Sequence, residues 1–388
     1  MSGLYIHIPF CEHKCIYCDF YSIESLDAKN DFLRALRSEI DLYASSFQDE
    51  HFTTIFFGGG TPSLLSPKQI ADIIRHLGET FTVEPDAEIT LETNPGTVDR
   101  KKLEEFRKTG VNRISFGVQS FFDDDLKFLT RIHSADQARQ AVRFARDAGF
   151  GNINVDLIFA LPNQTISRWE QNLHSALELE PQHISAYSLI VERGTPLFRM
   201  VDAKIVSPQP VETEAAMYEM TMKHLHDVGF EHYEVSNYAK AGFRSRHNCK
   251  YWDHSHYVGF GPSAHSFVSG KRWWNVSNIR TYCDNLEQNR SPVSGSELLS
   301  PAELYDEAIM LGLRSDGIDL HRLHAEHGVD LLSRHGPFID QLLAEQLVVV
   351  EPNVLRLTDK GFLLCDEISG RLLGNAFSGV RPPVLSGC

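Results

Sequence analysis

The chain has 388 residues, of which 42% are hydrophobic and 23% are charged, and its formal net charge is −15. These values are typical of a globular protein with one large domain and a smaller one, and they exclude a disordered or fibrous chain. The excess of negative charge argues against nucleic acid and anionic lipid as partners, because both are negatively charged themselves.

Short apolar segments rich in β-branched and aromatic residues alternate with segments of helical periodicity along the first half of the chain. The predicted strands are residues 3–10, 53–59, 88–94, 113–119, 152–162 and 183–191. The predicted helices between them are residues 30–44, 67–76, 99–108, 135–148 and 167–179. Six βα units are too few for a closed eight-stranded barrel. We therefore predict an α/β fold whose first domain, residues 1–205, is a partial six-stranded (β/α)6 TIM-like barrel.

The pattern changes after the sixth strand. Residues 206–299 contain a predicted helix at 211–228 and an aromatic, histidine-rich stretch at 233–274, and we expect them to flank the barrel. Residues 300–388 predict helices, a small β-hairpin and a last helix, which is a helical, winged-helix-like domain. Residues 301–388 contain 13 acidic and 7 basic residues, so we do not expect this domain to bind DNA.

Three cysteines follow the first predicted strand with the spacing Cys-x3-Cys-x2-Cys, at Cys11, Cys15 and Cys18. Three thiolates on one short loop can ligate three irons of a 4Fe-4S cluster and leave the fourth iron without a protein ligand. A zinc site is the alternative, but it needs a fourth ligand, which His13 could provide. The other four cysteines are scattered, so a secreted disulfide framework is not expected.

Glycine and polar residues gather at the carboxyl ends of the next strands, where parallel β/α folds bind their ligands. Gly58, Gly59, Gly60, Thr61 and Pro62 end the second strand, and their backbone can approach a ligand closely. Further polar residues lie at or near the ends of the later strands: Glu92, Gln119, Arg131 and Asp156. Each one alone could be an ordinary capping or ion-pair residue.

Together these segments resemble the coproporphyrinogen-oxidase-like branch of the radical S-adenosylmethionine (SAM) proteins. The resemblance rests on YIHIPFCEHKCIYCDF, FFGGGTPS, LETNPG, RISFGVQSF, NVDLIFALP and LTDKGFLLCDEI, and it covers essentially the whole chain. It implies that the cysteines hold a 4Fe-4S cluster. It also implies that SAM is bound by Tyr5, Gly59, Gly60, Thr61, Glu92, Gln119, Arg131 and Asp156.

Two features separate this sequence from the oxygen-independent coproporphyrinogen oxidases. The oxidase-type motif has a fourth cysteine two residues after the third, and Phe20 stands at that position here. Oxidase-type chains are longer and have an N-terminal extension, whereas this sequence begins four residues before Tyr5. We therefore do not expect porphyrinogen decarboxylation.

The segment HNCKYW, residues 247–252, resembles the HNxxYW signature of the HemW haem-chaperone group. The resemblance favours His247 as an axial ligand of haem iron, with Tyr251 and Trp252 packing against the porphyrin. A lone histidine beside aromatic residues is often only a packed core residue. The histidines nearby, His254, His256 and His265, are alternative ligands.

The sequence thus predicts a cytoplasmic haem chaperone that carries a 4Fe-4S cluster, SAM and haem. Its expected partners are haem, haem-acceptor proteins of unknown identity and a reductant for the cluster, without nucleic acid and without a transmembrane segment. The alternatives are an oxygen-independent coproporphyrinogen III oxidase or another radical SAM enzyme that modifies tetrapyrroles. A radical SAM enzyme that modifies RNA is disfavoured by the acidic C-terminal segment.

Overall fold

The computed structural model describes residues 1–373. Six consecutive strands pair in parallel within a single curved sheet, in the order in which they occur along the chain. They are β1 (Ser2–Ile8), β2 (His51–Gly59), β3 (Thr82–Thr93), β4 (Arg113–Gln119), β5 (Ile153–Phe159) and β6 (His183–Ser188). This arrangement confirms the predicted partial barrel. Because the inner strands are covered on both faces, they are long runs of buried residues, as all seven residues of β1 are.

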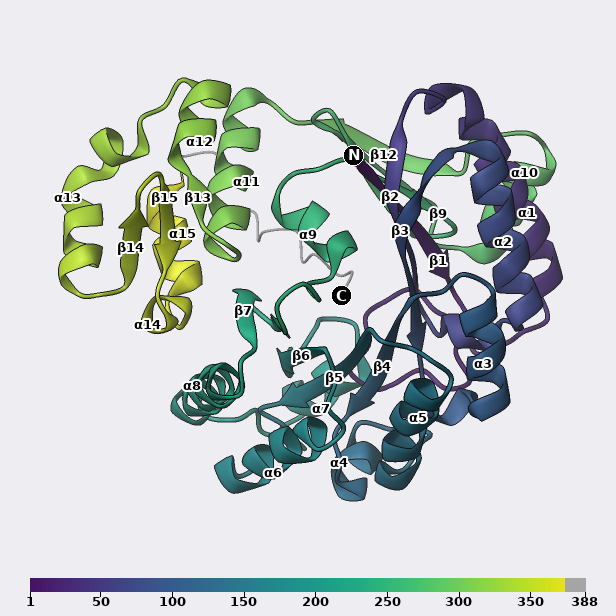
Figure 1. Ribbon diagram of the computed structural model, residues 1–388, viewed down its shortest axis with the longest axis horizontal. Helices are drawn as coiled ribbons and strands as arrows, with labels where there is room; N and C mark the ends of the chain where they lie inside the picture. Colours follow the sequence, from purple (N-terminus) through teal and green to yellow (C-terminus); the bar gives the residue numbers. More distant parts are fainter. Residues whose placement is uncertain (374–388) are drawn as a thin grey trace.

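Helices connect these strands and cover the outside of the sheet (Figure 1). They are α1 (Lys29–Tyr43), α2 (Pro67–Thr80), α3 (Arg100–Lys108), α4 (Asp123–Phe128), α5 (Ala135–Asp147) and α6 (Ile166–Leu177). Short 3-10 helices occur at Ala44–Ser46, Pro62–Leu64 and Pro95–Thr97. Serine side chains begin α2 and α5 with complete capping boxes, Ser66 with Gln69 and Ser134 with Gln137, which satisfy backbone N–H groups that have no partner inside the helix.

The sheet continues beyond the six parallel strands on both sides, which the sequence analysis did not predict. Strand β9 (Tyr257–Phe260) pairs in parallel with β1, and antiparallel strands follow it to one edge. These are β10 (His265–Val268), β11 (Lys271–Asn275) and β12 (Val293–Leu298). Beyond β6 the sheet is completed by β8 (Asn237–Ala239) and β7 (Glu231–Glu234).

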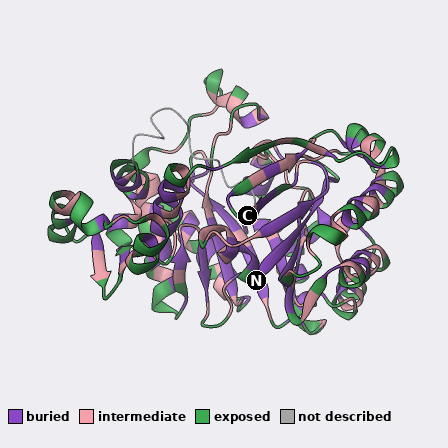
Figure 2. Ribbon diagram, turned by 90° about the horizontal axis from the view of Figure 1, so that it is seen from above, coloured by how far each residue is buried: buried purple, intermediate pink, exposed green. Residues whose placement is uncertain are grey.

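Four further helices belong to this middle part of the chain. They are α7 (Pro196–Asp202), α8 (Val211–Asp227), α9 (Arg246–Trp252) and α10 (Ile279–Glu287). Figure 2 shows that the central strands are mostly buried, whereas the outward faces of the surrounding helices are exposed. Within residues 1–373, no helix combines the length and the apolar character that crossing a membrane requires.

The C-terminal elements form a small helical unit with a core of its own, which contains Ile309, Leu342 and Leu355. Its helices are α11 (Pro301–Leu313), α12 (Leu320–His327), α13 (Leu331–Ala344), α14 (Asp359–Phe362) and α15 (Cys365–Leu372). Its three-stranded sheet contains β13 (Ile318–Asp319), β14 (Val348–Glu351) and β15 (Val354–Leu357). The helices and the β14–β15 hairpin agree with the predicted winged-helix-like fold. The boundaries at residues 205 and 299 stay predictions.

Candidate functional site

The three clustered cysteines lie on a loop that the backbone closes at its base. The N–H of Cys11 donates to the carbonyl of Ile23 at 2.9 Å, and the N–H of Ile23 donates to the carbonyl of Pro9 at 2.8 Å. Cys11 and Cys15 are buried, and Cys18 is half-buried. The loop therefore begins directly at the carboxyl end of β1, at the mouth of the partial barrel.

Two side chains from other elements contact the cysteine sulfurs. The Thr61 hydroxyl donates to Sγ of Cys11 at 3.6 Å, and Nη1 of Arg131 donates to Sγ of Cys15 at 3.4 Å. The same guanidinium donates from Nη2 to the carbonyl of Gly117 at 2.6 Å, so β4 holds it in place. Thr61 and Arg131, both predicted as ligand-binding residues, thus stabilise the cysteine loop, and a cation beside a thiolate favours metal ligation.

Within residues 1–373, the three clustered thiols do not form a compact zinc site. Two sulfurs that bind one tetrahedral zinc are roughly 3.8 Å apart, from Zn–S distances of about 2.3 Å. Among residues 1–373, no set of three metal-binding side chains that includes these cysteines has its ligand atoms within 4.8 Å of one another. His13, the possible fourth zinc ligand, instead contacts Glu24, with 3.0 Å between Nδ1 and Oε1.

At the end of β2, neighbouring atoms lie so close to the backbone that only glycine fits without a clash. Gly59 has a φ of +103°, and a Cβ at this position would lie 2.5 Å from the ring of His7. A Cβ on Gly60 would lie 2.6 Å from the carbonyl oxygen of Phe10. Both glycines therefore let the end of β2 pass against β1 and the start of the cysteine loop.

Glu92 and Asp156 are brought together inside the barrel. Burial and the nearby charge of Asp156 raise the pKa of Glu92 to about 8, against an opposing hydrogen bond from the Gly59 backbone. Burial also raises the pKa of Asp156. The Asp156 carboxylate accepts hydrogen bonds from Ser115 at 3.0 Å and Asn154 at 2.6 Å. A cationic ligand group beside these two carboxyls would be stabilised by their ionised forms.

Tyr5 points into the same interior, where its hydroxyl lies 3.2 Å from Nδ1 of His7. The other nitrogen of His7, Nε2, lies 2.8 Å from the carbonyl oxygen of Tyr21 at the end of the cysteine loop. Sequence analysis did not identify His7 as a site residue. The alternation along β1 could have done so, because residues 5 and 7 face the same side of a strand.

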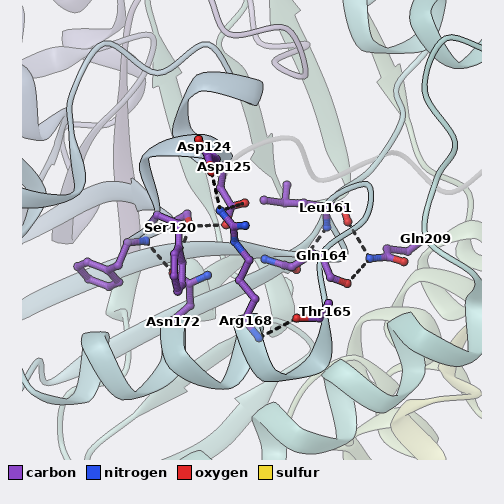
Figure 3. A network of polar contacts seen from close by, with 11 residues as sticks. Ser120, Asp124, Asp125, Leu161, Gln164, Thr165, Arg168, Asn172 and Gln209 are labelled. Carbon is purple, nitrogen blue, oxygen red and sulfur yellow. Dashed lines mark hydrogen bonds and ion pairs between the residues drawn. The ribbon is translucent and has the colours of Figure 1, made fainter.

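Gln119 ends β4 in a left-handed conformation, with a φ of +69°. The turn that follows is fixed by the polar network of Figure 3, in which the Ser120 hydroxyl donates to Asp125 at 2.7 Å and lies 3.2 Å from Oδ1 of Asn172. Arg168 completes the network with an ion pair of 3.1 Å to Asp125. This support behind the turn fixes the end of β4, which positions Gln119. The contact between Gln119 and SAM stays a prediction.

The HNCKYW segment forms α9 and lies away from the cysteine loop. The backbone N–H of His247 donates at 3.1 Å to Glu88, which lies in β3 four residues before Glu92. Its ring also approaches Gly3, so closely that a Cβ there would lie 3.0 Å from it. Helix α9 therefore packs against the amino-terminal halves of the strands, between the sheet and α11 (Figure 1). The cysteine loop follows the carboxyl end of β1, whereas α9 packs near the amino ends of the strands and the His247 ring reaches Tyr5, with 6.3 Å between centroids.

The side chain of His247 is buried and both of its ring nitrogens have partners. Nδ1 lies 2.8 Å from the Thr54 hydroxyl, and Nε2 lies 3.0 Å from the Tyr251 hydroxyl. The ring stacks on Phe56 with 5.0 Å between centroids. Burial lowers the pKa of His247 to about 3, so the imidazole is neutral. Ligation of iron by Nε2 requires Tyr251 to move away.

Trp252 lines a cavity of about 200 Å³ between α9 and the C-terminal unit. Among residues 1–373, its buried indole N–H has no hydrogen-bond partner. Ligand pockets for molecules of moderate size measure about 300–1,000 Å³. A porphyrin therefore needs α9 or α11 to shift before it can enter this cavity.

The three alternative histidines have different surroundings. His254 is half-buried, and its Nε2 lies 3.0 Å from Glu307. His256 lies 3.4 Å from the Ser269 hydroxyl. His265 is exposed on β10 and stacks on Trp274 with 6.0 Å between centroids. Of these three residues, His265 is the most exposed.

A cysteine loop at the carboxyl end of the first strand of a partial six-stranded barrel defines a radical SAM protein. Residues 5–176 match the family model of the radical SAM superfamily, and residues 299–364 match that of the HemN C-terminal domain. The solved coproporphyrinogen III oxidase HemN from Escherichia coli has the same fold, with a TM-score of 0.82 and 22% identity over 96% of this chain and 89% of the oxidase.

Relatives with higher identity cover nearly the whole chain. The heme chaperone HemW of Bacillus subtilis is 37% identical over 96% of this chain and 100% of the relative. The heme chaperone HemW of Mycobacterium tuberculosis is 35% identical over 96% of this chain and 95% of the relative. The chain therefore belongs to the HemW family of radical SAM proteins.

The raised pKa of Glu92 makes SAM binding testable by proton release. At pH 7 the carboxyl of the unliganded protein is mostly protonated because its pKa is about 8. A bound sulfonium or ammonium group lowers this pKa, so the carboxyl loses its proton on binding. We expect Glu92→Gln to abolish the release and to weaken SAM binding by at least about tenfold, as expected for losing a charged partner. Calorimetry of the cluster-loaded protein in buffers of different ionisation enthalpy measures both effects.

Glu84→Gln is the matched control, because Glu84 lies on the same strand but pairs with His51 at 2.6 Å. The control should bind SAM like the unmodified protein, and iron content should be the same in all variants. Unchanged affinity and proton release in Glu92→Gln would show that Glu92 does not contact SAM.

Proposed function

We propose that this protein is a haem chaperone, which binds haem and delivers it to acceptor proteins, and that it carries a 4Fe-4S cluster and SAM at the carboxyl end of its barrel. The observation that carries the proposal is the similarity to the HemW of Bacillus subtilis, which spans the entire length of that relative. The haem acceptors and the reductant of the cluster stay predictions, as does a cytoplasmic location.

The residues at the mouth of the barrel suit a cluster with an open iron. Cys11, Cys15 and Cys18 would hold it, and Arg131 would compensate the charge of the thiolates. When bound and reduced, such a cluster would supply the electron for the reductive cleavage of SAM, which releases methionine. The buried pair Glu92 and Asp156 would orient the cationic part of SAM.

For haem we propose His247 as the axial ligand through Nε2. The neutral imidazole is the form that ligates iron, and the low pKa of His247 guarantees it. The hydrogen bond between Nδ1 and Thr54 would remain and orient the ring, as the second nitrogen does in most metal-binding histidines. Tyr251 and Trp252 would then contact the porphyrin with their apolar faces.

Haem titration of the cluster-loaded protein tests this function. We expect one haem per chain and a Soret band of a histidine-ligated iron, because the chain offers a neutral imidazole at His247. In a parallel incubation with coproporphyrinogen III, SAM and a reductant under anaerobic conditions, we expect no decarboxylated tetrapyrrole. The absence of haem binding together with product formation would instead establish the oxidase.

A further inference from the structure

A group of three potential metal ligands lies on the outer helices, away from both sites described above. Glu170 and His174 are one helical turn apart on α6, and His224 faces them from α8. One ligand atom from each of the three lies within 4.8 Å of the other two. Because residues i and i+4 share a face of a helix, α6 presents its two ligands side by side.

The packing of α6 on α8 holds these side chains in a fixed frame. The buried indole N–H of Trp169, next to Glu170, donates to the Thr221 hydroxyl at 2.9 Å and approaches the carbonyl of Met217 at 3.3 Å. This contact lies one turn before His224 and fixes the distance between the helices. Ligands on packed helices are preorganised for a metal ion more accurately than ligands on loops.

The imidazole of His224 is oriented as a metal ligand. Its Nδ1 lies 3.0 Å from the carbonyl oxygen of Met220, so Nδ1 carries a hydrogen, and in the neutral ring Nε2 presents its lone pair. That nitrogen lies 3.4 Å from Oε1 of Glu170. A histidine whose second nitrogen donates to a backbone carbonyl is the usual arrangement in metal sites. Two electron-pair donors thus face each other across a short gap that a cation would fill.

The surrounding charge also favours a cation. His174 and His224 both lie in the last turns of their helices, where the carbonyl groups without intrahelical partners create negative potential. Glu170 adds one negative charge. The ring of His174 is exposed and stands edge-on to that of His224, with 5.8 Å between centroids. It can therefore rotate to approach an ion from solvent.

We propose that Glu170, His174 and His224 bind one divalent transition-metal ion of the zinc class. Two imidazoles and one carboxylate suit zinc, which takes a water molecule as its fourth ligand. Neighbouring ligand atoms of tetrahedral zinc are roughly 3.3 Å apart, from bond lengths of about 2.0 Å. The contact between Nε2 of His224 and Glu170 already has nearly this spacing, so only His174 must move. The ion would fasten α6 to α8 on the outside of the barrel.

Zinc titration of the full-length, cluster-loaded protein tests the proposal, because the cluster occupies the thiols that would otherwise compete for zinc. We expect about one zinc per chain without loss of iron. We expect X-ray absorption to show nitrogen and oxygen neighbours at about 2.0–2.1 Å and no sulfur at about 2.3 Å. His174→Ala and His224→Ala should each weaken zinc binding by at least about tenfold, since each removes a ligand.

His226→Ala is the matched control, because His226 is an exposed histidine on the same helix but is not part of the group. It should leave zinc affinity unchanged. Because His174 is exposed, His174→Ala tests the site even if His224→Ala unfolds. Failure of the unmodified protein to bind zinc, sulfur neighbours around the bound zinc, or an equal loss in His226→Ala would overturn the proposal.

Discussion

Replacement of Cys11, Cys15 or Cys18 by alanine is expected to reduce the iron content of anaerobically reconstituted protein from about four per chain to nearly zero, because each thiolate holds a different iron of the cluster. The loop is closed at its base by backbone hydrogen bonds between Cys11, Ile23 and Pro9, which involve no side chains. The variants should therefore keep the fold. Iron and sulfide analysis measures the loss, and circular dichroism checks the fold.

Cys283→Ala is the matched control, since Cys283 is a half-buried free cysteine on α10. It should retain the full cluster, as should Cys365→Ala. The same expectation for Cys388 concerns a residue outside the described part of the chain. A reconstituted protein that retains zinc instead of iron and sulfide would contradict the cluster assignment.

His247→Ala is expected to lower haem affinity by at least about tenfold and to shift the Soret band, because the iron loses its nitrogen ligand or recruits another. The cluster should be unaffected, since α9 packs near Gly3 and Glu88 rather than near the cysteine loop. Haem titration followed by absorption measures both the affinity and the ligand. Iron analysis of the same samples shows whether the cluster is intact.

Because His247 is buried, its replacement also leaves a cavity, and a second variant separates ligation from packing. Tyr251→Phe removes the hydroxyl that lies 3.0 Å from Nε2 of His247. If Nε2 ligates iron, this variant should bind haem with at least the affinity of the unmodified protein and with the same Soret band. His265→Ala serves as the control for an exposed histidine. Loss of the histidine-ligated spectrum in His265→Ala, with normal spectra in His247→Ala, would transfer the ligand assignment to His265.

The sequence alone predicted the six parallel strands and the helices between them, because their signals are local. Strands buried on both faces are continuous apolar runs, and helices such as α2 begin at a capping serine followed by a periodic apolar face. The cysteine loop was predicted for the same reason, since the spacing of Cys11, Cys15 and Cys18 is a property of one short segment. The positions of Glu92 and Gln119 followed from the rule that parallel strands end at one edge.

Only the tertiary structure decided which distant residues meet. The pairing of β9 with β1 joins residues about 250 positions apart, and strands of only three to five residues are too short to show a clear periodicity. The burial of His247 against Thr54 and Tyr251 likewise depends on how α9 packs against the amino-terminal halves of the strands. The same holds for Glu170, His174 and His224, because two helices separated by more than thirty residues must pack before three ordinary surface side chains become a set of ligands.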